Sequence, residues 1–264
     1  MRGKMTETIL LCEESPEGIF TGVYTAYELK LSPNHTHLQL GGIDNYQLFA
    51  RYKEVAADAE KAFKVERSLR KRLGDEALES VWYAMSSYDL RKGDAVYHTI
   101  ARGLAGAFRG QLMDYLQDPY VNLTAKLRLN VWHEAHRFMG FVRFAQLESG
   151  ILYSEIEPKN DVLPFLGEHF SDRLPQENFM IRDKGRELYL IHRANQGYFL
   201  FKDPNGQWGG QESSPVLHYS HNEEQIQKLF RCFVDSISIK ERENKSLQRQ
   251  MLPLRFRPNM VEFD

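Results

Sequence analysis

The sequence predicts an α+β fold in which a helical middle region packs with a small antiparallel sheet. Two patterns support this fold class. Apolar residues recur every three or four positions through the middle of the chain, as on the buried face of helices. Near the C-terminal end, short apolar runs alternate with turn sequences, as in antiparallel strands. The chain has 264 residues, 42% of them hydrophobic, which is enough to bury a full core.

We expect one compact domain over residues 1–264. Its first part, residues 1–149, would contain an N-terminal strand and helix followed by the helical region. Its second part, residues 150–264, would be rich in β-strands. No linker rich in glycine, proline or serine separates the two parts.

The N-terminal elements are a strand over residues 8–12 and a helix that ends near Leu31. Ser15 is a typical N-cap for that helix, because its hydroxyl can accept a hydrogen bond from the first turn. A further strand is expected over residues 46–55.

Four helices are predicted in the middle of the chain, over residues 58–73, 76–88, 94–116 and 122–148. In the third of these, Gly103, Gly106 and Gly110 would lie on one side. Each interior glycine costs about 1 kcal/mol relative to alanine. We therefore expect another backbone, from a packed helix or a bound sugar–phosphate chain, to approach this side closely.

After Gly150 the sequence changes from helical to strand-like patterns. We expect, in order, a strand over 151–156, a short helix over 161–174, three strands of an antiparallel meander over 179–182, 187–192 and 198–202, and a last helix capped by Asn222.

Composition excludes several classes of protein. The formal net charge is −2, so any contact with nucleic acid must come from a local basic patch. Cys12 and Cys232 are far apart and form no CxxC motif, which excludes a disulfide framework, a zinc ribbon and an iron–sulfur cluster held by this chain. No segment reaches the length of a membrane span. We expect a cytoplasmic protein without membrane contact, bound cofactor or metal.

The predicted helix over 58–73 is the first candidate for contact with nucleic acid. Lys64, Arg67 and Lys71 would project opposite its apolar stripe, with Arg70 beside them. Phosphates suit such a face, because each contact releases a counterion. The alternative is an ordinary solvated helix face, since two glutamates lie nearby.

Four further arginines extend this candidate set. Arg102 and Arg109 are seven residues apart and would share a face away from the apolar stripe of the third middle helix. Arg137 and Arg143 are second choices on the fourth helix. Because that helix is apolar nearly all round, Arg143 is expected to need a carboxylate or phosphate partner.

No catalytic constellation is identified from the sequence. The histidines of His133-Glu134-Ala135-His136 are three residues apart and do not match the HExxH spacing of zinc proteases. His136 is expected to be a core histidine. If the protein is an enzyme, Glu134, His136, Asp161 or His169 would carry the chemistry.

Long motifs along the chain resemble those of a bacterial family assigned to DNA repair or DNA metabolism. The matching stretches are Glu17–Phe20 with Ala26–Glu28, Trp132–Phe144, Gly150–Tyr153, Glu157–Pro164, His169–Arg173 and Leu247–Pro253. Members of that family accompany a radical-SAM protein thought to modify or repair DNA. In some chains the domain is fused to a uracil-DNA-glycosylase-like domain.

The resemblance implies a DNA context and a radical-SAM partner, but it implies no reaction and no catalytic residue. With two cysteines, this chain would leave the iron–sulfur chemistry to the partner. We therefore expect an accessory protein that binds DNA and a radical-SAM protein. The alternatives are a lesion-processing nuclease or glycosylase-like enzyme, and an assembly factor with an exposed apolar patch and no continuous basic surface.

Overall fold

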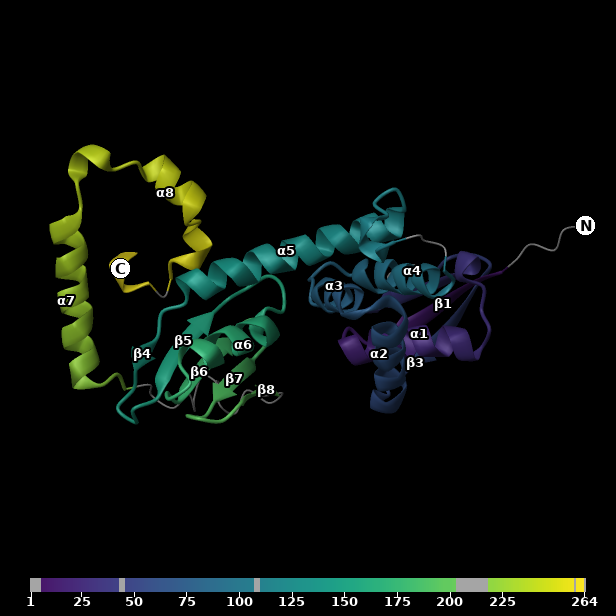
Figure 1. The fold of residues 1–264 in the computed structure, drawn as a ribbon, viewed down its shortest axis with the longest axis horizontal. Helices are drawn as coiled ribbons and strands as arrows, with labels where there is room; N and C mark the ends of the chain where they lie inside the picture. The colour runs from purple at the N-terminus through teal and green to yellow at the C-terminus, as the bar shows by residue number, and fades with distance from the viewer. Residues whose placement is uncertain (1–5, 43–45, 107–109, 203–217, 259, 264) are drawn as a thin grey trace, which may run out of the picture. The chain divides into compact units, whose positions relative to one another are not determined.

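The computed structural model describes residues 6–42, 46–106, 110–202, 218–258 and 260–263. The chain forms two compact units, Met1–His133 (unit 1) and Glu134–Asp264 (unit 2). Each unit contains helices and a sheet, which confirms the α+β class (Figure 1). The boundary falls inside one helix, whereas the sequence placed its internal division after residue 149. The expectation of a single domain stays a prediction.

Unit 1 contains a parallel sheet with the strand order β2–β1–β3. Its strands are β1 (Glu7–Cys12), β2 (Thr36–Leu40) and β3 (Ala50–Val55). Helix α1 (Pro16–Glu28) connects β1 to β2, because two parallel neighbours need a crossover connection. Ser15 caps α1 as predicted, accepting a hydrogen bond from the Gly18 amide at 3.0 Å. Strand β2 was missed by the sequence analysis.

Three further helices of unit 1 are α2 (Ala59–Leu73), α3 (Asp75–Met85) and α4 (Lys92–Leu104). The prediction that the third middle helix reaches residue 116 is wrong. Gly106 has a φ of 69°, a left-handed conformation that follows the last helical turn rather than continuing it. Of the three glycines, Gly103 alone lies within α4, where a side chain would collide with Leu73 and Leu112.

Helix α5 (Pro119–Phe141) crosses the boundary between the units. Asp118 directly precedes it, and the Asp118 carboxylate accepts hydrogen bonds from the Tyr120 and Val121 amides. The prediction that Asn122 caps this helix and that it continues to residue 148 is therefore wrong at both ends.

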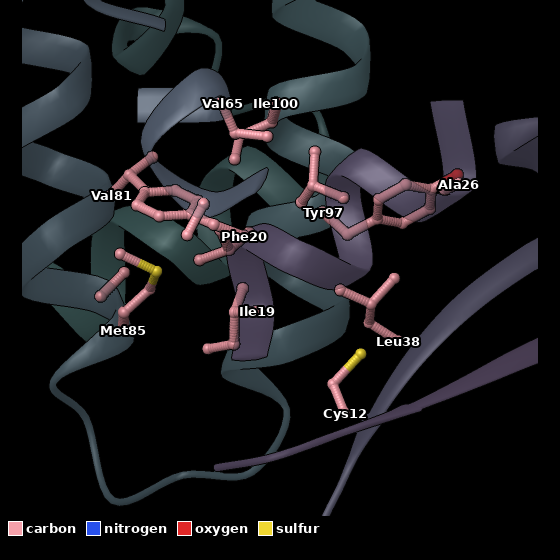
Figure 2. Packing of buried hydrophobic residues seen from close by; sticks show 14 of the residues in the cluster. Cys12, Ile19, Phe20, Ala26, Leu38, Val65, Val81, Met85, Tyr97 and Ile100 are labelled. Atoms are coloured by element: carbon pink, nitrogen blue, oxygen red, sulfur yellow. The ribbon is translucent and has the colours of Figure 1, made fainter. Parts of the chain in front are cut away.

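The core of unit 1 joins the sheet to its helices. Figure 2 shows Ile19 and Phe20 of α1 among side chains from other elements, including Cys12, Val81 and Met85. Phe20 also meets Trp82 edge-on, with 5.7 Å between the ring centroids. This core fixes the positions of the helices that carry the candidate site.

Unit 2 contains a mixed sheet with the order β4–β5–β6–β7–β8. Its strands are β4 (Ala145–Gln146), β5 (Leu152–Ile156), β6 (Phe179–Asp183), β7 (Leu188–His192) and β8 (Tyr198–Lys202). Strands β6, β7 and β8 form the predicted antiparallel meander. Strands β5 and β6 are parallel and are connected through α6 (Leu163–Arg173), whose Leu166 and Phe170 belong to the core of this unit.

The remaining helices of unit 2 are α7 (His221–Ile237) and α8 (Lys245–Met251). Ser220 rather than Asn222 caps α7. Several large apolar side chains of α7 are exposed, among them Leu229, Phe233 and Ile237. The short 3-10 helices of the chain are η1 (Pro33–His35), η2 (Leu112–Asp114), η3 (Lys240–Arg242), η4 (Leu254–Phe256) and η5 (Val261–Phe263). No helix in the described ranges is both long and apolar enough to cross a membrane.

Candidate functional site

The exposed side of α2 carries three of the predicted phosphate contacts, Lys64, Arg67 and Lys71. The opposite side of the helix is buried in the core of unit 1, so these three cations point to the solvent. A rise of about 1.5 Å per residue spreads them over about 10 Å. Within the described ranges none of the three forms an ion pair, and α2 as a whole has six basic and two acidic residues.

Aromatic side chains accompany these cations. Phe63 on α2 is 63% exposed. The ammonium groups of Lys61 and Lys64 lie 5.3 and 5.9 Å from the ring centroid of Tyr24 on α1, within the range of cation–π attraction. We refer to Tyr24, Lys61, Phe63, Lys64, Arg67 and Lys71 as the α1–α2 basic surface.

The other predicted phosphate contacts in unit 1 either have carboxylate partners or lie outside the described residues. Arg70 forms ion pairs with Glu66 at 3.2 Å and with Asp75 at 3.3 Å. Arg102 forms an ion pair with Asp118 and places its guanidinium carbon 4.9 Å from the Tyr120 ring centroid. Arg109 lies outside the described residues, and the face that it was expected to share with Arg102 required the longer helix that α4 does not form.

The two second-choice arginines lie in unit 2. Arg143 has the predicted carboxylate partner, Glu262, with 3.0 Å between Nη2 and Oε1, but it lies beyond the end of α5 rather than on that helix. Arg137 is exposed, and its guanidinium carbon lies 6.0 Å from the Phe256 ring centroid.

The residues considered for catalysis have different surroundings. The expectation that His136 is a core residue is wrong: it lies on the exposed side of α5, one position beyond the inward-facing Ala135. Glu134 is buried and holds a loop in place through Lys159, Asn160 and Arg255. Asp161 and His169 lie beside or on α6, and among the described residues neither belongs to a cluster with metal-ligand spacing.

The structure brings together a cluster that the sequence analysis did not identify, formed by His37, Asp94 and His98 in unit 1. In the part of the chain that the structure describes, this is the one group of histidine, cysteine or carboxylate side chains spaced to hold a metal, with ligand atoms within 4.8 Å of one another. Asp94 Oδ1 lies 3.1 Å from His37 Nδ1 and 3.3 Å from His98 Nε2. We refer to these three residues as the His–Asp–His cluster.

Two secondary structure elements position the cluster. Asp94 and His98 are four residues apart on α4 and so share a face. His37 lies on β2, one of the two edge strands of the sheet. A side chain at Gly93 would collide with Leu40 of β2, so glycine permits the close approach that lets Asp94 accept a hydrogen bond from the Leu38 amide at 3.3 Å.

The electrostatics of the cluster favour an ionised carboxylate. Burial alone would raise the pKa of Asp94, but its interactions with His37 and His98 outweigh burial and lower that pKa to about 2. The hydrogen bond with Asp94 raises the pKa of His37. Burial raises the pKa of Tyr120, whose ring stacks on His98 with 4.0 Å between centroids.

The sequence did contain a signal for this cluster. Asp94 and His98 have helical i, i+4 spacing, as metal ligands often do. However, His37 and Asp94 are 57 positions apart in the sequence, and their proximity depends on the missed strand β2.

Comparison with known proteins identifies the family. The model of a domain of unknown function, DUF4130, matches residues 91–262, which is most of the chain. The chain belongs to the DUF4130 family. The matched region includes Asp94, His98 and Arg102, whereas α2 and His37 precede it.

The other comparisons assign no function to this DUF4130 protein. No curated protein matches the chain. A solved structure described as the DHH domain of a member of a family of ribosomal proteins has 10% sequence identity and a TM-score of 0.32. Its alignment covers 72% of this chain and 74% of that chain. This similarity identifies neither the fold nor the activity.

Proposed function

We propose that this DUF4130 protein is a nucleic-acid-binding accessory protein of cytoplasmic DNA metabolism that works with a radical-SAM protein. The α1–α2 basic surface is the observation that carries the proposal. Three of its four cations, Lys64, Arg67 and Lys71, have no ion pair within the described residues, whereas Lys61 pairs with Glu28 at 3.4 Å. The formal net charge of the chain is −2. Contacts from Lys64, Arg67 and Lys71 to phosphates would release counterions and so drive binding.

The aromatic residues favour single-stranded DNA as the bound form. Proteins that bind single strands combine cations that follow the backbone with aromatic rings on which bases stack, each stack contributing about 1–3 kcal/mol. Phe63 is exposed on the same helix as the cations and is available for such stacking. Arg70 and Arg102, which have carboxylate partners, would contribute less than Lys64, Arg67 and Lys71.

The partner part of the proposal rests on the family resemblance, on the cysteines and on α7. Cys12 and Cys232 are both free, as expected in a reducing compartment. The exposed apolar residues of α7 are of the kind that contact other proteins. They also fit the alternative of an assembly factor, but that alternative predicted no continuous basic surface.

Fluorescence anisotropy with labelled single- and double-stranded DNA across a salt series tests the DNA part. We expect the double variant Arg67→Glu, Lys71→Glu to bind at least tenfold more weakly, because two phosphate contacts become repulsive. The slope of log affinity against log salt should fall by about one for each lost contact.

The matched control is Lys228→Glu, Arg231→Glu, which reverses two exposed cations three residues apart on α7. It changes the net charge by the same amount and should retain most of the affinity. Equal losses in both double variants would indicate a nonspecific charge effect and contradict this location. A wild-type protein with no affinity for DNA at low salt would overturn the DNA-binding proposal itself.

A further inference from the structure

The His–Asp–His cluster has the donor set of a metal site. Two imidazole nitrogens and one carboxylate form the ligand set found in catalytic zinc sites and in non-haem iron sites. In a tetrahedral zinc site, bonds of about 2.0–2.1 Å place neighbouring donors about 3.3 Å apart. The separations of 3.1 Å from Asp94 Oδ1 to His37 Nδ1 and 3.3 Å to His98 Nε2 match this spacing.

A second observation points to a missing partner at the same place. The side chain of His98 is only 5% exposed, and its Nε2 atom makes no hydrogen bond within the described part of the chain. This nitrogen faces Asp94, yet the geometry is not that of a hydrogen bond. Leaving a buried polar atom without a hydrogen-bond partner is unfavourable. A metal ion bound between His98 and Asp94 would satisfy it.

We propose that His37, Asp94 and His98 bind one divalent first-row transition-metal ion, with Glu7 as a positioning residue. The proposal is independent of the DNA-binding role, since it involves none of the residues of the α1–α2 basic surface.

Glu7 on β1 occupies the place of an outer carboxylate. Its Oε2 atom is buried and accepts no hydrogen bond from the described residues. This atom lies 3.8 Å from Nε2 of His37. The Oε1 atom of Glu7 lies 3.0 Å from Nδ1 of His35. With Nδ1 of His37 on the metal, the proton of that ring resides on Nε2 and faces Glu7. A carboxylate behind a metal-bound histidine fixes the tautomer and orients the ring.

The exposure of the ligands leaves room for a further one. His98 is buried, but the side chains of His37 and Asp94 are 38% and 28% exposed. Three protein ligands with solvent access leave an open coordination position, as in catalytic rather than structural zinc sites. Nitrogen donors favour transition metals over Mg²⁺ and Ca²⁺, which bind mainly through oxygen.

Equilibrium dialysis of the metal-stripped full-length chain against Zn²⁺, with elemental analysis, tests the proposal. We expect one Zn²⁺ per chain, and a Co²⁺-loaded sample should show the visible absorption of a site with nitrogen and oxygen ligands. His37→Ala and Asp94→Asn should each weaken binding at least tenfold. Glu7→Gln should weaken it about 10–100-fold through the outer carboxylate.

The control is His133→Ala, which removes an exposed histidine of the same unit outside the cluster and should bind like the wild type. Far-UV circular dichroism of each variant separates loss of a ligand from loss of the fold. His37 and Asp94 are chosen because both are partly exposed, whereas removing the buried His98 ring endangers folding. Stoichiometric binding of Fe²⁺ without oxygen, in place of Zn²⁺, would also support the site.

Two outcomes would overturn it. The first is a folded wild-type chain that binds none of Zn²⁺, Co²⁺ and Fe²⁺ stoichiometrically. The second is unchanged affinity in folded His37→Ala and Asp94→Asn, which would place the bound ion elsewhere. Neither outcome affects the DNA-binding measurement, which uses different variants and a different readout.

Discussion

Buried polar residues determine local structure in both units, and Glu134 is the clearest case. Its side chain is 2% exposed and accepts hydrogen bonds from the Asn160 amide at 2.8 Å and from Asn160 Nδ2 at 2.6 Å. The Lys159 amide donates at 3.2 Å, and Arg255 Nη1 lies at 3.0 Å. A carboxylate with four such partners holds a loop and a 3-10 helix to α5. Its role is therefore structural, although the sequence considered it for catalysis.

Glu134→Ala should destabilise the chain by about 3–5 kcal/mol, because removing one partner leaves buried donors and a cation uncompensated. Urea unfolding measures the loss. Glu157→Ala removes an exposed glutamate of the same unit and should change stability by about 0.5 kcal/mol or less. If the two variants unfold at the same urea concentration, the four contacts of Glu134 contribute nothing to stability.

At the scale of single residues, local interactions were predictable and distant ones were not. The Ser15 cap depends on a hydroxyl and an amide three residues apart, so the sequence contains all of its information. A carboxylate partner of Arg143 was predicted from a position on an apolar helix, but Arg143 lies two residues beyond the end of α5, and the sequence could not name Glu262, 119 residues away. The His–Asp–His cluster has the same character, since the fold alone brings His37 to α4.

At the scale of elements, apolar periodicity predicted α2, α3 and the meander of β6–β8, but it misplaced several helix ends. Periodic apolar residues continue past Leu104, yet α4 stops there and Gly106 takes a positive φ. Strand β2 was missed although its five residues alternate buried apolar or threonine positions with His37 and Gln39, since only Leu38 and Leu40 are apolar. So short a run is a weak signal unless its parallel neighbour β1 is known.

The β6–β7 hairpin of unit 2 depends on an aspartate at the end of β6. Asp183 Oδ1 accepts hydrogen bonds from the Gly185 and Arg186 amides at 2.9 and 3.2 Å, and its Oδ2 lies 3.0 Å from Arg186 Nη1. The residue is fully buried. Burial raises the pKa of Asp183 above 3.8, although the charge and hydrogen bonds of Arg186 oppose this effect.

A raised folded-state pKa makes the stability of the hairpin depend on pH. The folded chain then holds the Asp183 proton more tightly than the unfolded chain does. The corresponding stabilisation is fully present below the unfolded pKa and is lost as pH rises through the folded pKa. Asp183→Asn cannot titrate. The free energy of unfolding of the wild type minus that of the variant should therefore decrease as the pH rises from the unfolded-state pKa of Asp183 to its folded-state pKa.

Urea unfolding of the wild type and of Asp183→Asn across the acidic pH range measures this difference. Each tenfold change in the folded-state acid dissociation constant of Asp183 alters the difference by about 1.4 kcal/mol. Asp172→Asn, at an exposed position on α6, is the control and should show no such trend. A difference that grows with pH would mean that the Arg186 ion pair, rather than burial, dominates at Asp183.

At the scale of the whole molecule, the two units have separate apolar cores. Along α5, Leu127 belongs to the core of unit 1, whereas Ala135 and Phe138 belong to the core of unit 2. The boundary between His133 and Glu134 lies inside an uninterrupted helix, where composition does not change. For this reason the sequence, read for linkers, indicated a single domain. The DUF4130 match over residues 91–262 also includes parts of both units.

Separate cores predict separate responses to a cavity. Phe20 in unit 1 and Phe179 in unit 2 are each buried in one core. Phe20→Ala and Phe179→Ala should each cost about 3–5 kcal/mol within their own unit. Amide hydrogen exchange followed by mass spectrometry should show faster exchange in β1 and β2 for Phe20→Ala, with β6 and β7 still protected, and the reverse for Phe179→Ala. Equal loss of protection in both units from either variant would instead establish the single cooperative domain that the sequence predicts.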